Sequence, residues 1–189
     1  MTQRQLLKQI QRSEIKLPPI HSELTELRHV GPPLIKGAAK VYVWADALCE
    51  LIYAGLRRDS VMQAAVLVGG VYAGPGETFV EVRGYADLER YEDTTDFARS
   101  INEDWTLLRN RLARREERVS IVGWACLRQG LESELARDLQ IAHRSFFNLP
   151  HQLLLAIEPH TQELALYGFD EIGRLVQIGF QLVVRRTDS

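Results

Sequence analysis

The chain has 189 residues, 46% of them hydrophobic and 25% charged, and a net charge of −2. This composition is typical of one soluble globular domain, and the small net charge gives no general attraction to nucleic acid or anionic membranes. No apolar run approaches the ~20 residues of a membrane span, and the N-terminus lacks the apolar core of a signal peptide. With only two cysteines, Cys49 and Cys126, we expect no disulfide framework and a cytoplasmic location.

The N-terminal residues differ from the rest of the sequence. Leu6, Leu7 and Ile10 have the spacing of the apolar stripe of one short basic helix, and the proline pairs at 18–19 and 32–33 then interrupt regular structure. We therefore expect an N-terminal arm or linker over residues 1–38, with a poorly ordered terminus as the alternative. A single domain is expected over residues 39–185, followed by a short tail over residues 186–189.

The first half of the expected domain alternates between strand and helix patterns. Residues 40–43 predict a short strand, and apolar side chains at helical spacing predict an amphipathic helix over residues 44–57. The continuous apolar run over residues 64–72 suits a strand buried on both faces. Alternation over residues 79–83 predicts a strand with two unlike faces, and a helix is expected over residues 96–116.

The second half begins with an apolar stretch over residues 119–124, which predicts a strand. Apolar side chains from Leu135 to Phe146 then repeat at helical spacing, with Ser133 as a candidate N-cap. Three strand-like stretches follow, at residues 151–157, 163–168 and 174–184. This order predicts a mixed sheet with helices against it, an α/β or α+β domain. We also expect Trp124 and Phe146 to be buried, because each ends or lines an apolar stretch.

Short motifs stand at particular places within these elements. Residues 62–69 read Met-Gln-Ala-Ala-Val-Leu-Val-Gly, an apolar strand that ends in glycine. The strand over residues 119–124 ends in Val-Gly-Trp, and the following helix contains Arg-Ser-Phe at residues 144–146. This element order with these motifs resembles the MPN/JAB family, the fold of the JAMM zinc peptidases, over about residues 39–185. The resemblance implies an MPN/JAB-like (cytidine-deaminase-like) mixed β-sheet flanked by helices.

The resemblance also implies where a zinc site would lie. In active family members two histidines and an aspartate hold Zn²⁺ and leave a position for water. The metal lowers the pKa of that water, a glutamate moves its proton, and a serine stabilises the oxyanion. In this chain every slot holds another residue type: Met62 for the glutamate, Cys126 and Arg128 for the histidines, Ala136 for the serine and Leu139 for the aspartate. Arg128 is a fixed cation that would repel a metal. We therefore predict no metal, no cofactor and no catalytic residue.

A different site near these slots is the alternative. Moving the alignment by one residue places Asp138 in the aspartate slot but restores neither histidine. A thiolate, an imidazole and carboxylates can bind zinc, although their spacing here is not that of a structural zinc site; the residues concerned are Cys126, Glu132, Glu134, Asp138 and His143. Cys126 as nucleophile with His143 as base would make a divergent hydrolase. Arg128 as an anion anchor would instead make a small-ligand-binding domain.

The function that the resemblance implies is that of a non-catalytic pseudoenzyme. Metal-free family members commonly act as subunits, so we expect a protein-interaction or scaffold role, with this chain pairing with itself or with another MPN-like protein. The helix over residues 44–57 is apolar around more of its circumference than one core-facing stripe requires. Its candidate interaction residues are Trp44, Leu48, Leu51, Ile52 and Tyr53; the alternative is a helix buried deeply in its own domain. No stripe of aromatic and basic residues indicates a nucleic-acid partner.

Overall fold

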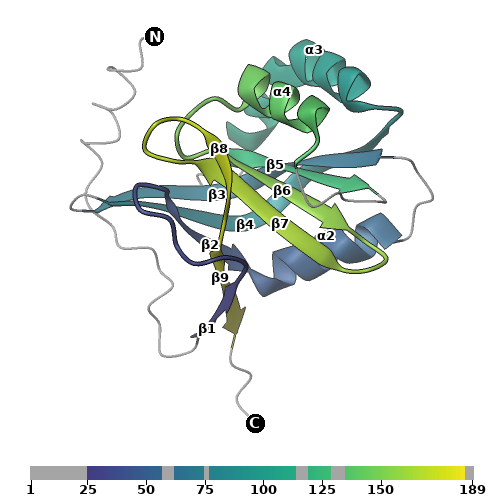
Figure 1. Cartoon of the computed structure of the whole chain (residues 1–189). Coiled ribbons are helices and arrows are strands. Elements are labelled where there is room, and N and C mark those ends of the chain that lie inside the picture. The colour runs from purple at the N-terminus through teal and green to yellow at the C-terminus, as the bar shows by residue number, and fades with distance from the viewer. Residues whose placement is uncertain (1–24, 57–61, 75–76, 114–118, 129–134, 186–189) are drawn as a thin grey trace.

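The computed structural model describes residues 25–56, 62–74, 77–113, 119–128 and 135–185. The short N-terminal helix, the candidate cap Ser133 and the tail over residues 186–189 lie outside these ranges. Helices and strands alternate along the chain in the order shown in Figure 1: β1 Thr25–Val30, β2 Lys40–Trp44, α2 Ala45–Leu56, β3 Met62–Gly74, β4 Glu77–Tyr91, α3 Thr94–Ala113, β5 Ser120–Arg128, α4 Arg137–Phe146, β6 Leu153–Glu158, β7 Glu163–Phe169, β8 Leu175–Ile178 and β9 Phe180–Arg185.

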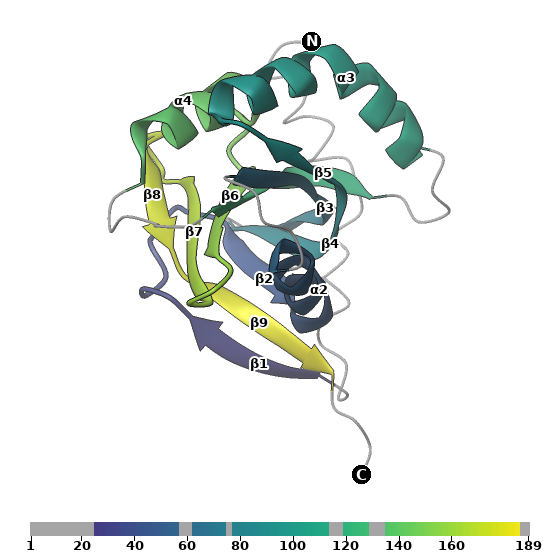
Figure 2. The same ribbon diagram turned by 90° about the vertical axis from the view of Figure 1, so that its right-hand side faces the viewer.

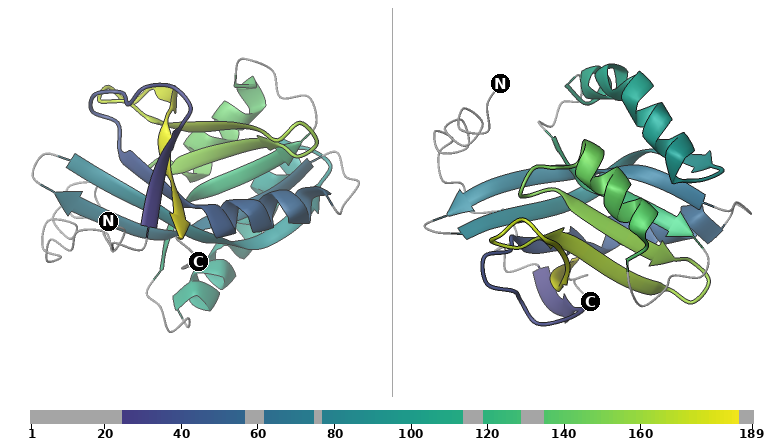
Figure 3. Two further views of the ribbon diagram at one scale, coloured as in Figure 1. Left: turned by 90° about the horizontal axis from the view of Figure 1, so that it is seen from below. Right: turned by 45° about the horizontal axis from the view of Figure 1, so that its top comes forward.

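The described strands form one nine-stranded sheet in the order β1-β9-β2-β4-β3-β5-β6-β7-β8. Strand β2 runs parallel to β4 and β9, and β5 runs parallel to β6, whereas the remaining neighbours are antiparallel. The sheet curls, so that β1 and β9 cross the direction of β3 and β4 steeply (Figure 3). The prediction of a mixed sheet with helices, an α/β or α+β domain, is confirmed.

Strand β1 corrects the expectation of an arm that extends to residue 38. Thr25–Val30 pairs antiparallel with β9 from Thr25 opposite Arg185 to Val30 opposite Phe180, so these residues belong to the sheet. Most side chains of β1 are exposed or only half-buried, and an edge strand of this kind has no strong apolar alternation for sequence analysis to find. The glycine and prolines at 31–33 therefore separate two strands of the sheet.

Several element boundaries also differ from the expectation. Trp44 ends β2 and does not begin the helix, which starts at Ala45. The single strand expected over residues 174–184 is two strands, β8 and β9, interrupted at Gly179. A Cβ atom at Gly179 would lie 2.1 Å from the Pro32 carbonyl oxygen, so a side chain at this break would clash with the segment that follows β1. Strands β3 and β4 are longer than expected because they pair along nearly their whole length.

Two apolar clusters fill the two faces of the sheet, and Figure 2 shows α2 on one side and α3 with α4 on the other. The cluster on the α2 side is called the aliphatic cluster: Val41, Val43, Leu48, Leu51, Ala65, Leu67, Val80, Val82, Val122, Ala125, Leu127, Leu153, Leu155, Ile157, Leu166, Ile178 and Phe180. The cluster under α3 and α4 is called the aromatic cluster: Met62, Ala64, Val66, Val68, Ala86, Phe97, Ile101, Trp124, Cys126, Leu139, Ala142, Phe147, Leu154, Ala156 and Tyr167. Alternate residues of β3, β5 and β6 supply both clusters, as the period of a strand requires.

Strand β5 lies at the centre of both clusters, and Gly123 allows its path. The β3–β5 register shifts between Leu67 and Val68, and Gly123, opposite Leu67, has a φ of +151°. A Cβ atom at Gly123 would lie 2.0 Å from the Leu153 carbonyl oxygen of β6. Only glycine tolerates both conditions, and the bulge next to it turns Trp124 into the aromatic cluster.

The expected burial of Trp124 is confirmed, whereas that of Phe146 is only partly right. Trp124 is fully buried, but Phe146 is half-buried at the edge of the aromatic cluster. Phe147, the residue that caps the C-terminal end of α4, is the fully buried ring. Leu139, His143 and Phe147 follow one another at intervals of four residues, which places all three on the buried face.

Candidate functional site

The structure brings the five slot residues together at one end of β5 and α4. Met62 on β3 lies directly opposite Arg128 on β5 in the sheet register. Met62, Cys126 and Leu139 are buried within the aromatic cluster. Ala136 is the N-cap of α4, packs against the same cluster and makes no side-chain capping hydrogen bond. The slots are therefore neighbours in space, and three of them are packed core positions.

Cys126 is a buried thiol. Its side chain is fully buried on β5, opposite Ala64 on one side and Ala156 on the other. Burial raises the pKa of the thiol to about 12, an increase that the nearby charge of Arg128 opposes and that of Asp138 reinforces. A thiol with this pKa stays protonated at neutral pH, whereas metal binding and nucleophilic attack both require the thiolate.

Arg128 and Asp138 form a polar pair beside the cluster. The Arg128 Nη1 atom lies 3.6 Å from Asp138 Oδ2, and the Thr94 hydroxyl donates a hydrogen bond to the same carboxylate oxygen. The contact links the first residue of α3 to the first turn of α4. The Arg128 side chain is 22% exposed, so this cation is held at the slot by a carboxylate and is not an open anion anchor.

His143 lies on the buried face of α4, and its ring bonds to Trp124 and not to Cys126. Trp124 Nε1 donates a hydrogen bond of 3.1 Å to His143 Nδ1, so the neutral ring carries its proton on Nε2. Burial, reinforced by the charge of Arg144, lowers the pKa of His143 to about 4. The buried Nε2 atom has no hydrogen-bond partner, and the ring is stacked near Phe147 and lies tilted against Phe169. No hydrogen bond joins Cys126 to His143, so the expected nucleophile and base are not paired.

A relocated metal site finds no support within the residues that the structure covers. Among them, no group of three or more histidine, cysteine, aspartate or glutamate side chains is placed to hold a metal ion. Glu132 and Glu134, two of the five residues proposed for such a site, lie outside the described ranges.

The five candidate interaction residues of α2 divide into buried and accessible ones. Leu48 and Leu51 belong to the aliphatic cluster, with 7% and 1% of their surface exposed, so they are wrong as surface candidates. Ile52 is half-buried against the same cluster. Tyr53 is 64% exposed and remains a surface residue. The helix is therefore neither deeply buried nor apolar on its outer face, where Asp46, Cys49, Glu50, Tyr53 and Leu56 lie.

Trp44 has a different position from the one that helical spacing suggested. It ends β2 on the sheet face opposite α2, where its Nε1 donates a 2.7 Å hydrogen bond to Glu81. Glu81 is fully buried. It also accepts a hydrogen bond from the Tyr72 hydroxyl and forms an ion pair with Arg83. The Arg185 guanidinium lies 5.1 Å from the Trp44 ring centroid. Trp44 is therefore part of a polar network of the sheet, which satisfies a buried carboxylate.

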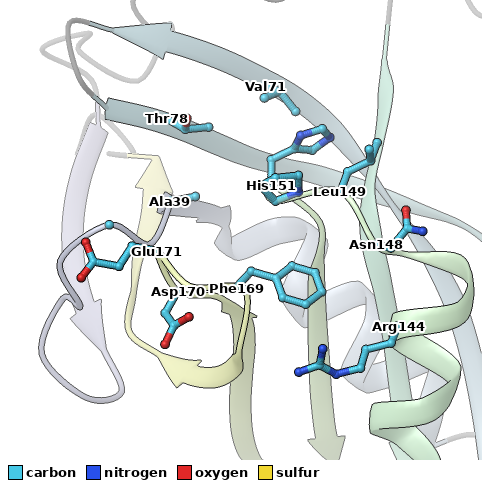
Figure 4. Close-up of a pocket in the computed structure, with 13 residues that line it drawn as sticks. Ala39, Val71, Thr78, Arg144, Asn148, Leu149, His151, Phe169, Asp170 and Glu171 are labelled. Carbon is cyan, nitrogen blue, oxygen red and sulfur yellow. The ribbon is translucent and has the colours of Figure 1, made fainter. Parts of the chain in front are cut away.

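A cavity of about 590 Å³ that sequence analysis missed lies at the other end of α4. The chain segments that line it come from the loop before β2, the ends of β3 and β7, the start of β4, and the connection from α4 to β6 (Figure 4). Arg144, Asn148, His151 and Phe169 are among its lining side chains. Because these segments are far apart in the sequence, no spacing motif marked the site. The only sequence signal was Arg144 itself, within the Arg-Ser-Phe motif.

No protein-family model matches the chain, and no curated protein matches it. Among solved structures, the solution structure of protein DSY2949 from Desulfitobacterium hafniense is similar, with a TM-score of 0.47 and 11% identity over 78% of this chain and 94% of that one. Within the described residues, no helix combines the length and the apolar character that a membrane crossing requires.

Proposed function

We propose that this chain is a non-catalytic MPN/JAB-like protein that acts as an interaction or scaffold subunit, pairing with itself or with another MPN-like protein. The observation that carries the proposal is the packing at the slots: Met62, Cys126 and Leu139 are core side chains of the aromatic cluster. A hydrolytic zinc site needs three protein ligands and an open position for water. Closed apolar packing provides neither.

The charges around the slots support the same proposal. Arg128 carries a permanent positive charge beside Met62 and Cys126, and its partner is Asp138. A divalent cation at this place would be repelled by the guanidinium, and the carboxylate that could attract the cation already accepts contacts from Arg128 and Thr94.

A divergent cysteine hydrolase is the weaker candidate. It needs a thiolate within hydrogen-bond reach of a base. Cys126 has a pKa of about 12 through burial, and His143 accepts its hydrogen bond from Trp124. Both groups are fully buried, so a substrate would have no access to them without opening the aromatic cluster.

The outer face of α2 supplies the surface for pairing. Tyr53 is 64% and Leu56 37% exposed, and the two residues lie three apart, on neighbouring turns of the same helix face. Aromatic residues on an exposed helix are enriched at protein interfaces, where a tyrosine buries a large area at a small entropic cost. An α2–α2 contact centred on Tyr53 is therefore the geometry we favour for a homotypic pair.

Sedimentation velocity of the full chain at about 1–100 µM tests the homotypic pair, a range that corresponds to about 5–8 kcal/mol of binding free energy. We expect a dimer, and we expect Tyr53→Glu to weaken it about tenfold or more because a charge would be buried at the contact. The matched control is Ile172→Glu, which introduces the same charge at a residue that is 69% exposed in the turn between β7 and β8. Its dimer should be unchanged.

A photo-crosslinking amino acid at position 53 tests the heterotypic pair in native cells. We expect one dominant crosslinked partner with an MPN-like sequence, and no such product with the crosslinker at position 172. A monomer up to about 100 µM together with no crosslink at position 53 would contradict the proposed function. Hydrolytic activity that is lost in Cys126→Ala would contradict it in favour of the hydrolase.

A further inference from the structure

We propose that the cavity at the C-terminal end of α4 binds a small carboxylate that carries an apolar body, with Arg144 as the contact for the carboxylate group. Its volume of about 590 Å³ falls within the range of small-molecule sites, roughly 300–1,000 Å³. None of the exposed α2 side chains lines the cavity, so this site is independent of the pairing surface. It is also separate from the slots, which lie at the opposite end of a ten-residue helix.

Arg144 is held in place without a carboxylate partner. Its Cζ atom lies 5.9 Å from the centroid of the Phe169 ring, a cation–π contact that restricts the guanidinium. Among the described residues no aspartate or glutamate forms an ion pair with it, and Figure 4 shows the side chain extending from α4 along the cavity toward Phe169. A planar guanidinium in this state can donate two parallel hydrogen bonds to a carboxylate.

The other cavity walls suit an apolar body with few polar groups. Val71, Leu149 and Phe169 supply apolar surface, the composition usual for a small-molecule site. Asn148 and His151 are the polar neighbours, and neither side chain has a hydrogen-bond partner within the described part of the chain. Burial lowers the pKa of His151, so at neutral pH its ring is uncharged and can donate or accept one hydrogen bond.

The acidic residues at the cavity do not change the expected charge of the ligand from negative to positive. Asp170 accepts hydrogen bonds from the backbone of Ile172 and Arg174 and forms a 2.8 Å ion pair with Arg174, so its charge is compensated. Glu171 points away from the cavity in Figure 4. The carbonyl end of α4 adds a partial negative charge. Arg144 is therefore the group that must attract an anion, and its removal should weaken binding strongly.

NMR titration of the ¹⁵N-labelled full chain tests the proposal with three probes. Phenylacetate joins a carboxylate to an aromatic body, phenylacetamide has the same body without the charge, and acetate has the charge without the body. We expect phenylacetate to give saturable shifts at residues 144–151 and 169–173 below about 10 mM. Phenylacetamide and acetate should each bind at least about tenfold more weakly than phenylacetate, a difference of about 1.4 kcal/mol on the same scale.

Arg144→Gln should reduce phenylacetate binding at least about tenfold. The matched control Arg137→Gln, at another exposed arginine in the first turn of α4, should leave it unchanged. Both variants should keep the spectrum of the folded protein, because both side chains are on the surface. Equal binding of phenylacetamide, unchanged binding by Arg144→Gln, shifts confined to other residues, or no saturable shift with phenylacetate would each overturn the proposal.

Discussion

The two faces of the sheet are filled by different chemistry. The aliphatic cluster under α2 contains Phe180 as its one ring among the described residues, and its other members are aliphatic. In the aromatic cluster Trp124 is stacked on Phe97 at 4.5 Å and near Phe147 at 6.0 Å between centroids, and a buried imidazole joins the stack. Aliphatic packing is non-directional. The stability of the aromatic cluster also depends on the hydrogen bond between Trp124 and His143 and on the relative orientations of its rings. Single substitutions in the two clusters should therefore lower the free energy of unfolding by different amounts.

The largest expected effect is at Trp124. Trp124→Ala should lower the free energy of unfolding by about 3–5 kcal/mol, because it leaves a cavity in the cluster, and it also removes the hydrogen bond that the His143 ring accepts at Nδ1. Trp124→Phe keeps a ring but loses the indole donor and should cost about 1–3 kcal/mol. Leu155→Met in the aliphatic cluster conserves volume and should cost less than about 1.5 kcal/mol. Urea denaturation curves measure all three, and a Trp124→Ala cost below that of Leu155→Met would contradict the comparison.

Phe146 and Phe147 give a matched pair of adjacent rings. Phe147→Ala should cost about 3–5 kcal/mol, the usual range for a fully buried phenylalanine, since Phe147 contacts both Trp124 and His143. Phe146 is only half-buried, so Phe146→Ala should cost about 1 kcal/mol, near the average of point substitutions. The same denaturation experiment compares them. Equal costs would contradict the half-buried position of Phe146.

The buried imidazole makes the aromatic face sensitive to pH. His143 has a pKa of about 4 in the folded protein, against about 6.5 when unfolded. Between pH 4 and pH 6.5 the unfolded chain therefore binds a proton at His143 and the folded chain does not. The free energy of unfolding has its full His143 contribution above about pH 6.5 and decreases as the pH falls toward 4. The expected loss between pH 7 and pH 5 is about 2 kcal/mol.

Variants separate this histidine from the others. His143→Leu should remove most of the loss in free energy of unfolding between pH 7 and pH 5. Burial also lowers the pKa of His151, which adds a loss of the same sign, so His151→Asn is measured beside it. A pH dependence that is unchanged in His143→Leu would contradict the buried neutral imidazole.

The sequence predicted elements where the apolar period is strong. Strands β5 and β6 appear near their expected positions because they are continuous apolar runs buried on both faces, and helix α4 does so because its buried residues recur at helical spacing. It missed β1, whose exposed and half-buried side chains carry no such pattern and whose partner β9 lies more than a hundred residues away. It placed Leu48 and Leu51 on a surface because periodicity gives the width of an apolar stripe but not how much of that stripe the sheet covers.

The slots could be located from the sequence and the cavity could not. The resemblance to the MPN/JAB family implied that Met62, Cys126 and Leu139 would be neighbours, and the sheet register and core packing place them close together. Cys126 and His143 were a possible nucleophile and base by residue type alone, without a supporting motif, and whether the two side chains bond depends on which way each one turns. The cavity combines loop and strand ends whose approach is set by the curl of the whole sheet. Such proximity has no local signal.

The smallest expected effect concerns zinc, because we expect no stoichiometric zinc binding at the slots. Zinc binding at the slots would require removal of a proton from Cys126, whose pKa of about 12 reflects its burial, and would require Met62 and Leu139 to leave the aromatic cluster. We expect protein dialysed against zinc and then desalted to retain clearly less than one equivalent by elemental analysis. The measurement uses Cys49→Ser, because Cys49 is an exposed thiol that can bind zinc weakly at the surface. One equivalent of zinc that disappears when Cys126→Ala is added would contradict both the packed aromatic cluster and the proposed non-catalytic role.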